Sequence, residues 1–480
     1  MTTPRFPQQF PDYIELPEPK LVFNPYDAAA TDAHPLRGLT RFGPYSNGIY
    51  EAVPSSIRLA AIVPEGTGPQ LQKFFLEINH RQEPRERKAY LPPFPGFAVA
   101  FKRTIAPLDP IIELPAAVET SVTLGPTPQK SLSDAIFAAI RQAAIRRADW
   151  DVLLIYLPDR WVRGFRGGPN LDFDLHDMIK AFCAAQSIPT QVLNDDVFHY
   201  HCRASVCWRL AIALYAKAGG IPWKMESVAS DTAFVGLSYA LRKSGTALQY
   251  VTCCSQIFDA QGSGLEFLAY DTQGRAMRIE GKNPFLYRDQ MRAVMSKSLG
   301  LYLDGHAGQM PSRVVIHKNT EFKQAEIDGV FDAFDRVEDI ELLTVQESPW
   351  RAVRLLAAAA GSAAPSTADR YPLKRGTLVQ VGENELLLWT QGDASAVTGG
   401  TAWFQEGKGI PRPLLLRRYA GHADAAQVGS EVLALSKMDW NNDQLYNTLP
   451  ATQSFAHDLA EVVKRIPKLD PRPYPLRLFM

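Results

Sequence analysis

Cysteine is scarce in this sequence, and long apolar runs are missing. The five cysteines among 480 residues include no CxxC pair, and their odd number indicates reduced thiols. No apolar run approaches the roughly 18 residues that a membrane-spanning helix needs. The first residues, MTTPRFPQQFPDY, contain no apolar core of a secretion signal. We therefore expect a protein of the reducing cytoplasm that is neither secreted nor inserted into a membrane.

An excess of charge of either sign is also absent. Lysine plus arginine number 51, aspartate plus glutamate number 51, and the formal net charge is zero. This balance excludes a histone-like polycation and leaves any nucleic-acid site to local basic patches. The composition, 46% hydrophobic and 21% charged, is that of a globular protein. At about 150 residues per domain, the length predicts about two or three domains.

Residues 1–56 form an entry segment with its own pattern. Two short extended stretches, Leu21–Phe23 and Gly48–Tyr50, are separated by a stretch in which prolines and glycines predict turns. We therefore predict a β-rich entry segment.

Residues 57–228 alternate between strand and helix patterns. Apolar runs of strand length lie at 57–64, 151–158 and 189–193, and helical patterns lie at 131–150, 174–187 and 204–220. Strands that alternate with helices in short steps form parallel sheets. The pattern predicts an α/β domain with a Rossmann-like parallel sheet.

Residues 229–480 begin with consecutive strand patterns, at 231–242, 248–259, 265–271 and 275–281. The next patterns are a helix at 287–304, strand–helix–strand at 312–318, 322–337 and 339–346, strands at 376–382, 384–391 and 413–419, and two closing helices. An antiparallel meander followed by β-α-β units is the order of an RNase H-like domain. Fold order alone is weak evidence of function.

Four polar residues of the middle region are placed to converge. His176 and Lys180 are four residues apart on one predicted helix and share a face. Gln191 lies on the next strand, and Lys217 ends the next helix. Two cations, an imidazole and an amide in this arrangement suit a phosphate. The alternative is that a lysine at a helix end only complements the helix dipole.

These segments, DLHDMIKAF, IPTQVL and LYAKAGGIPWKM, resemble the guide 5′-phosphate pocket in the MID domain of Argonaute proteins. His176, Lys180, Gln191 and Lys217 match that motif one by one, with His176 where many members have tyrosine. The resemblance implies that these residues bind the 5′ phosphate. Arg209 falls on the helical stripe of Lys217, so it is expected at a neighbouring guide phosphate.

The resemblance extends along the chain, from EPKLVF and DAHPLRGLTRFGPY to LLLWTQG and LYNTLPATQSFAHDLAEVVKR. The chain resembles the short prokaryotic Argonautes, which consist of MID and PIWI domains and lack N and PAZ domains. It implies a MID domain at 57–228 and an RNase H-like PIWI domain at 229–480.

The PIWI half lacks carboxylates at two expected positions. An RNase H-type nuclease holds two Mg²⁺ ions with a cluster of carboxylates. Ser238 stands where slicing members have the first Asp, and Asn319 where they have the second. Asp439 or Asp443 matches the last ligand position, but one carboxylate cannot hold two metals. We therefore expect no catalytic residues and no nuclease activity in this chain.

The resemblance implies a function in prokaryotic immunity. A guide RNA bound by its 5′ phosphate would pair with invading single-stranded DNA from a phage or plasmid. Relatives act with an APAZ-domain partner fused to an NAD-degrading effector, of sirtuin type or of Toll/interleukin-receptor type, or to a nuclease; the sirtuin type is expected here. The alternatives are an autonomous guide-directed nuclease and an α/β enzyme acting on a phosphorylated small molecule.

The sequence contains two candidate metal sites. The apolar end PLRLFM predicts a docked terminus. In relatives the terminal carboxylate helps to bind a divalent cation beside the guide phosphates, which implies Met480 as a ligand of Mg²⁺. Some relatives add a Gln one turn before the lysine, where this chain has Ala213. The run from His199 to Cys202, with Cys207 nearby, lacks the paired spacing of a zinc site.

Overall fold

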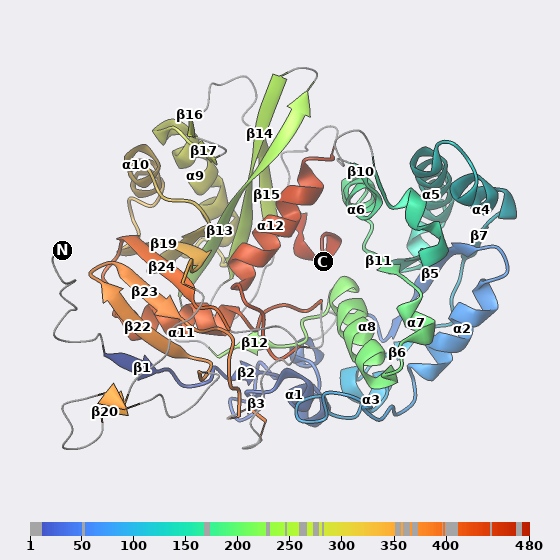
Figure 1. Ribbon diagram of the computed structural model, residues 1–480, viewed down its shortest axis with the longest axis horizontal. Coiled ribbons are helices and arrows are strands. Elements are labelled where there is room, and N and C mark those ends of the chain that lie inside the picture. The colour runs from blue at the N-terminus through green and yellow to red at the C-terminus, as the bar shows by residue number, and fades with distance from the viewer. Residues whose placement is uncertain are drawn as a thin grey trace, which may run out of the picture.

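Two large sheets with helices packed on them form the main body of the protein (Figure 1), as seen in a computed structural model. The structure describes residues 12–49, 53–167, 173–226, 231–244, 247–258, 266–271, 278–280, 283–350, 357–358, 365–366, 373–395, 397–398, 411–441, 444–466 and 473–480. Within these residues, no helix combines the length and the apolar character that crossing a membrane requires.

The first sheet is parallel and four-stranded, in the order β11-β8-β5-β7. Its strands are β5 (Leu59–Pro64), β7 (Ile111–Leu114), β8 (Val152–Tyr156) and β11 (Thr190–Leu193). Successive side chains of a strand point to opposite faces. Leu59, Ala61 and Val63 accordingly enter one core, whereas Ala60 and Ile62 enter another. Burial on both faces explains why the sequences of the central strands β5 and β8 are continuously apolar.

Helices cover both faces of this sheet. They are α2 (Gly68–Glu77) and α8 (Arg203–Lys217) on one face, and α5 (Pro128–Ala144) and α6 (Leu175–Ala185) on the other. Phe74 of α2 and Trp208 of α8 share a core with Leu59, whereas Ile136 of α5 and Ile179 of α6 pack on the opposite face. The predicted Rossmann-like arrangement is confirmed.

The second sheet has ten strands, in the order β1-β22-β23-β24-β19-β18-β13-β14-β15-β25. Its strands are β1 (Tyr13–Glu15), β13 (Thr232–Ser244), β14 (Ala247–Phe258), β15 (Glu266–Asp271), β18 (Arg313–Lys318), β19 (Asp339–Glu347), β22 (Thr377–Gly382), β23 (Glu385–Leu388), β24 (Leu414–Ala420) and β25 (Tyr474–Pro475). Strands β13, β14 and β15 form the antiparallel meander, and β13, β18 and β19 are parallel.

The helices of this half are α9 (Arg288–Gly305), α10 (Gln324–Ala333), α11 (Ala425–Leu435) and α12 (Ala451–Val463). Their order among the strands is the predicted RNase H-like order. One strand prediction was wrong in its pairing: the strand expected at 275–281 is β16 (Arg278–Glu280), which pairs with β17 (Asn283–Phe285) outside the large sheet.

The entry segment joins both halves but contains more helix than expected. Its β2 (Leu21–Val22) pairs with β3 (Thr31–Asp32) and β12 (Lys224–Met225). The turn-rich stretch forms helix α1 (Pro35–Phe42), and a 3₁₀ helix at Tyr45–Gly48 replaces the start of the second predicted strand. Residues 50–52 lie outside the described residues. The domain boundaries after residues 56 and 228 stay predictions.

The turn prediction is wrong for α1, because Pro35 and Gly38 each have a structural role in this helix. Pro35 occupies the first helical position, where its missing N–H is not needed. A Cβ on Gly38 would lie 2.0 Å from the Phe23 ring, so glycine permits that aromatic ring to pack against the helix. Both residues therefore belong to a helix that a turn rule assigns to a loop.

Candidate functional site

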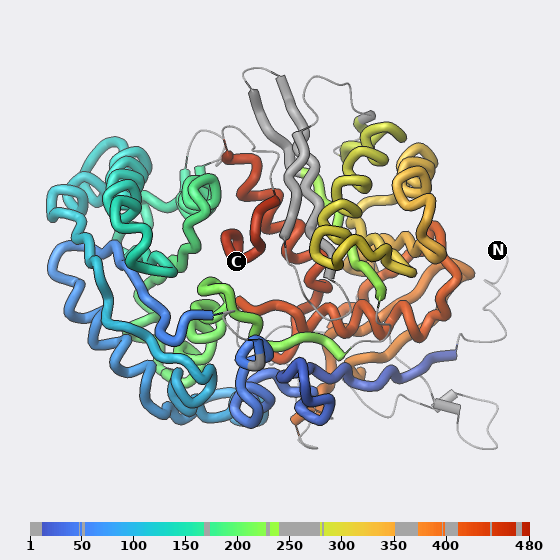
Figure 2. Tube along the Cα trace, turned by 180° about the vertical axis from the view of Figure 1, so that it is seen from behind, coloured from blue at the N-terminus to red at the C-terminus, as the bar shows by residue number. Residues whose placement is uncertain are grey.

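Helix α6, strand β11 and helix α8 carry the predicted site, and the chain end lies beside them. Asp174 caps the N-terminus of α6 by accepting from the Asp177 backbone N–H. Helix α8 stops at Gly219, whose φ of +103° favours glycine. Both views of the chain trace place the end of the chain between α12 and the helices α6 and α8 (Figures 1 and 2).

Lys180 is buried in the middle of α6, with 2% of its surface exposed. Its Nζ donates to the main-chain oxygen of Thr190 at 2.9 Å and to that of Met480. Burial penalises the charged form and lowers the pKa of Lys180 to about 8. The ammonium group of Lys180 therefore loses its proton at a much lower pH than that of an ordinary lysine.

Lys217, in the last turn of α8, is 1% exposed. Its Nζ donates to Oε1 of Gln191 at 2.8 Å, while Nε2 of Gln191 donates to the Val192 carbonyl oxygen at 2.9 Å. Burial lowers the pKa of Lys217 well below its ordinary value, and the charge of Lys180 lowers it further. The negative charge of Asp439 acts in the opposite direction and raises the pKa of Lys217.

Lys180 and Lys217 thus form a buried pair of like charges. No Asp or Glu of the described residues pairs with either ammonium group, and the oxygen that Lys180 contacts at Met480 belongs to the last residue of the sequence. Buried cations are usually paired because an unpaired buried charge is costly. An anion bound between these two side chains would supply the missing countercharge.

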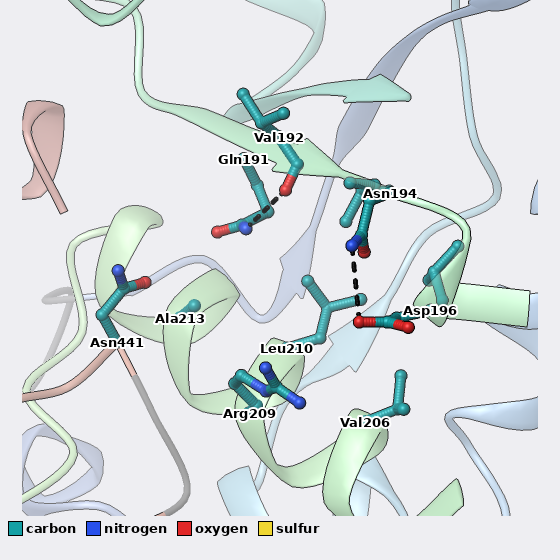
Figure 3. Close-up of a pocket in the computed structure, with 11 residues that line it drawn as sticks. Gln191, Val192, Asn194, Asp196, Val206, Arg209, Leu210, Ala213 and Asn441 are labelled. Atoms are coloured by element: carbon teal, nitrogen blue, oxygen red, sulfur yellow. Dashed lines mark hydrogen bonds between the residues drawn. The ribbon is translucent and has the colours of Figure 1, made fainter. Parts of the chain in front are cut away.

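A cavity of about 310 Å³ is lined by Gln191, the hydrogen-bond partner of Lys217 (Figure 3). Gln191 and Asn194 line it from the β11 segment, Arg209 and Ala213 line it from α8, and Asn441 reaches it from the second half of the chain. Arg209 is exposed and has no partner within the described ranges. The cavity therefore offers a free guanidinium group and amide groups, with the carboxylate of Asp196 in the same lining.

Sequence reasoning had not singled out Asn194 and Asn441 as lining residues. Asn194 follows β11 directly, so its place at the end of a parallel strand was a usable signal. Asn441 is more than two hundred positions away from this strand, and only the packing of the two halves brings it there.

His176 is placed differently from the other three predicted residues. Its side chain is 56% exposed, and Nδ1 lies 3.4 Å from Oδ1 of Asp177. Asp174, His176 and Asp177 present ligand atoms within 4.8 Å of one another, the only such group found in the described part of the chain. Both carboxylates already have cationic partners, Arg166 for Asp174 and Arg465 for Asp177. The structure therefore joins Lys180, Gln191 and Lys217 and leaves His176 at the surface.

The end of the chain is docked, as predicted. Leu476, Leu478, Phe479 and Met480 are buried, the first two in the 3₁₀ helix η4 (Leu476–Leu478). The residues around Met480 do not fit a metal ion. Its oxygen already accepts from Lys180, whose charge also acts on Lys217, and Ala213 offers no ligand. Cations repel a metal ion, so we derive no step through one.

The positions expected to hold nuclease carboxylates are neighbours in the second sheet. Leu237 of β13 pairs with Lys318 of β18, so Ser238 and Asn319 follow at adjacent positions. Ser238 is buried, and Gln346 Nε2 donates to the Asn319 main-chain oxygen at 2.5 Å. Asp439 accepts from the Asn441 N–H at 2.8 Å and from Asn447 Nδ2 at 2.6 Å, and Asp443 lies outside the described residues.

The other basic residues of the first half are mostly engaged within the protein. Four arginines pair with carboxylates, namely Arg146 with Asp109 and Asp149, Arg160 with Glu119, Arg166 with Asp174, and Arg203 with Glu77. Arg141 stacks over Phe182, Arg147 donates to the Trp150 carbonyl oxygen, and Arg163 donates to that of Thr123. Arg209 differs from these arginines because it has no partner among the described residues.

The cysteines near this site are structural. Cys202 and Cys207 are buried without a disulfide, and burial raises the pKa of Cys207 to about 12. His201 contacts Glu86 at 3.1 Å. No zinc-ligand group forms among these described residues. The side chains of Cys253 and Cys254, on β14, lie outside those that the structure describes.

Comparison of the sequence with family models and with curated protein sequences gives no match. The fold does match solved Argonaute structures. They are Clostridium butyricum Argonaute bound to a guide DNA and a 19-mer target DNA (TM-score 0.64, 16% identity), Aa-Ago with externally bound siRNA (0.64, 14%) and A. aeolicus Argonaute (0.61, 13%). Each match covers 97% of this chain but 54–56% of the Argonaute chain, so this chain spans about half their length. The chain therefore has the α/β fold of the MID–PIWI lobes of Argonaute proteins.

Proposed function

We propose that this chain binds a guide strand by its 5′ phosphate and presents it for pairing with a single-stranded DNA target. The observation that carries this function is the buried pair Lys180 and Lys217, which has no Asp or Glu partner in the described chain and lies beside a cavity lined by Gln191 and Arg209. A terminal phosphate would accept hydrogen bonds from both ammonium groups. Arg209 would bind a neighbouring phosphate of the guide backbone.

The guide is proposed to be RNA and the target to be invading single-stranded DNA. Clostridium butyricum Argonaute is bound to guide DNA and target DNA, and Aa-Ago carries an externally bound siRNA, so both kinds of strand occur with this fold. Base pairing would supply the sequence specificity, and the protein would read the backbone and the duplex shape.

The proposed output comes from a partner, because Ser238 and Asn319 supply no carboxylate where a metal-dependent nuclease needs them. The partner is an APAZ-domain protein with an NAD-degrading effector, of sirtuin type or alternatively of Toll/interleukin-receptor type. Recognition of phage or plasmid DNA would switch on this effector and arrest the infected cell. The place of action is proposed to be the cytoplasm.

Guide binding by matched variants tests this function. Lys180→Met and Lys217→Met replace each cation with an apolar chain of similar length. Each variant should weaken a 5′-phosphorylated RNA by about 1.5–3 kcal/mol, the contribution of a hydrogen bond to a charged group, and a 5′-hydroxyl RNA much less. Lys130→Met, in an exposed pair with Asp134, is the control. Equal losses for both RNAs would place the phosphate elsewhere.

The same loaded protein tests whether the PIWI half is silent. With Mg²⁺ or Mn²⁺ it should bind complementary DNA without cutting it. A single metal-dependent cut at a fixed distance from the guide 5′ end would falsify this and identify an autonomous guided nuclease.

A further inference from the structure

An open groove lies on the second half of the chain, away from the buried lysines. One cavity of about 410 Å³ is formed where α10 ends, β19 begins and β24 ends. A second cavity of about 230 Å³ adjoins it and shares Asn384 and Arg418 with it. We call this surface the acidic groove and define it by Phe331, Asp335, Glu338, Glu383, Tyr419 and Asp424.

The groove has an aromatic wall. Phe331, in the last turn of α10, is 45% exposed, whereas Phe334 is buried beneath the surface. Tyr419 of β24 is half-buried and lines the same cavity. An exposed phenylalanine beside a hollow is an anchoring point for an apolar side chain of a partner.

The charge at the rim of the groove is negative. Asp335, Glu338 and Glu383 are exposed, and each lacks a partner within the described ranges. Asp424 caps α11 by accepting from the Gln427 N–H at 2.7 Å. The cation in the wall, Arg418, is engaged by Glu341 and by the Ala423 carbonyl oxygen.

The excess of carboxylates over cations at the groove favours a cationic ligand and disfavours phosphate. Like charges across a surface disfavour the wrong partner, whereas opposite charges guide the right one. His422, which also lines the groove, is exposed and does not reverse the excess of carboxylates.

The groove lies at the opposite end of the parallel strands from Ser238 and Asn319. Strand β19 begins at Asp339, which lines the groove, whereas Asn319 follows the last residue of the parallel strand β18. Figure 1 shows α10 and β24 on the side of the molecule away from α5 and α6. A ligand here would leave the lysine pair and its cavity free.

We infer that the acidic groove is the docking surface of a partner protein. It takes an extended segment whose apolar side chain lies against Phe331 and Tyr419 and whose flanking lysine or arginine side chains pair with Asp335, Glu338 and Glu383. Charge complementarity argues for this occupant, because three unpaired carboxylates surround an apolar wall. Guide binding does not depend on this contact.

A synthetic peptide tests the inference on the full chain. The probe is a fluorescent peptide in which four arginines alternate with three leucines. Asp335→Lys combined with Glu338→Lys should weaken its binding at least about tenfold, because two attractions become repulsions. Phe331→Ser should weaken it as well. The control pair, Glu226→Lys with Asp304→Lys, reverses two exposed carboxylates outside the groove and should leave binding unchanged.

Peptide controls separate the two contributions. Serines in place of the leucines should weaken binding, and glutamates in place of the arginines should abolish it. A photoreactive benzoylphenylalanine at the central leucine should cross-link to residues 331–338 or 418–422. Binding of the serine peptide that equals that of the leucine peptide, or cross-linking elsewhere, would overturn the inference. So would displacement of the peptide by single-stranded DNA, or a dimer of this chain that the Asp335→Lys/Glu338→Lys variant breaks.

Discussion

At the scale of single residues, the proposed chemistry of this protein depends on two lysines that are buried in the fold. A surface lysine has a pKa near 10.4 and binds anions as a hydrated point charge. Lys180 and Lys217 are desolvated, so their contacts with an anion are stronger, while their own charge is harder to maintain. Affinity for a phosphate therefore couples to pH.

Discrimination between guides should fall as pH rises through about 8. The pKa of Lys180 is lowered to about 8 in the free protein, so above this pH the lysine is neutral and phosphate binding must first take up a proton. Affinity for a 5′-phosphorylated guide should drop by up to about tenfold per pH unit. Fluorescence anisotropy with phosphorylated and hydroxyl guides measures this drop.

Lys180→Met should flatten that pH profile, because the titrating group is gone. If the guide affinity of the Lys180→Met variant still falls with rising pH, another group takes up the proton on phosphate binding. For stability the sign is opposite: a lowered lysine pKa favours the neutral form, so the free energy of unfolding should rise between about pH 8 and about pH 10.5.

At the scale of elements, buried ion pairs hold the N-terminal segment against the second half of the chain. Glu18, just after β1, pairs with Arg375 at 3.0 Å and with Lys437 at 2.6 Å. Burial raises the pKa of the Glu18 carboxyl, but the charges of Arg375 and Lys437 outweigh burial and hold the pKa below its ordinary value. Lys437 also donates to the Pro19 and Ala33 carbonyl oxygens.

Glu18→Gln should lower the free energy of unfolding by about 3–5 kcal/mol, because it leaves two buried cations without their carboxylate. Chemical denaturation at neutral pH measures the loss. The control Glu15→Gln breaks an exposed pair with Lys374, which contributes about 0–1 kcal/mol.

The effect of Glu18→Gln should shrink in acid. A carboxyl with a lowered pKa stabilises the fold above its unfolded value of 4.5, and this stabilisation is lost as pH falls through the folded pKa. A difference between the two proteins that persists in strong acid would show that the ion pairs are not its cause.

The other end of the chain gives a second prediction for an element. Because Leu478, Phe479 and Met480 are buried and Met480 contacts Lys180, a short polar tag after Met480 should displace η4 and impair guide loading. The same tag before Met1 is the control. Unchanged loading with the C-terminal tag would show that the docked end has no part in the site.

At the scale of the whole molecule, sensing and output are proposed to belong to different chains. A permanent partner that supplies a wall for the guide–target duplex should bury well over about 2,000 Å². The co-expressed chains should elute as a stable heterodimer. After addition of guide RNA and complementary single-stranded DNA, this heterodimer should consume NAD⁺.

The heterodimer with Lys217→Met should respond much less to a phosphorylated guide and is the matched control. Constant NAD⁺ in the loaded wild-type complex, or a soluble chain that needs no companion, would contradict the proposed division of tasks.

Local sequence patterns determined much of the fold. Continuous apolar runs predicted β5 and β8, because strands buried on both faces have no polar side. Helical spacing and the stop at Gly219 predicted α8 and placed Lys217 at its end. The same logic failed at α1, where a nonlocal contact between Gly38 and Phe23 decides the conformation.

Only the tertiary structure decided how the site is assembled. Spacing placed His176 and Lys180 on one helix face, but the packing of η4 against α6 buries Lys180, while His176 is exposed beside Asp177. The contacts of Lys180 with Met480 and of the cavity with Asn441 join residues more than two hundred positions apart. A sequence fixes which side chains share an element, whereas burial, and with it a lysine pKa of about 8, depends on what packs over that element.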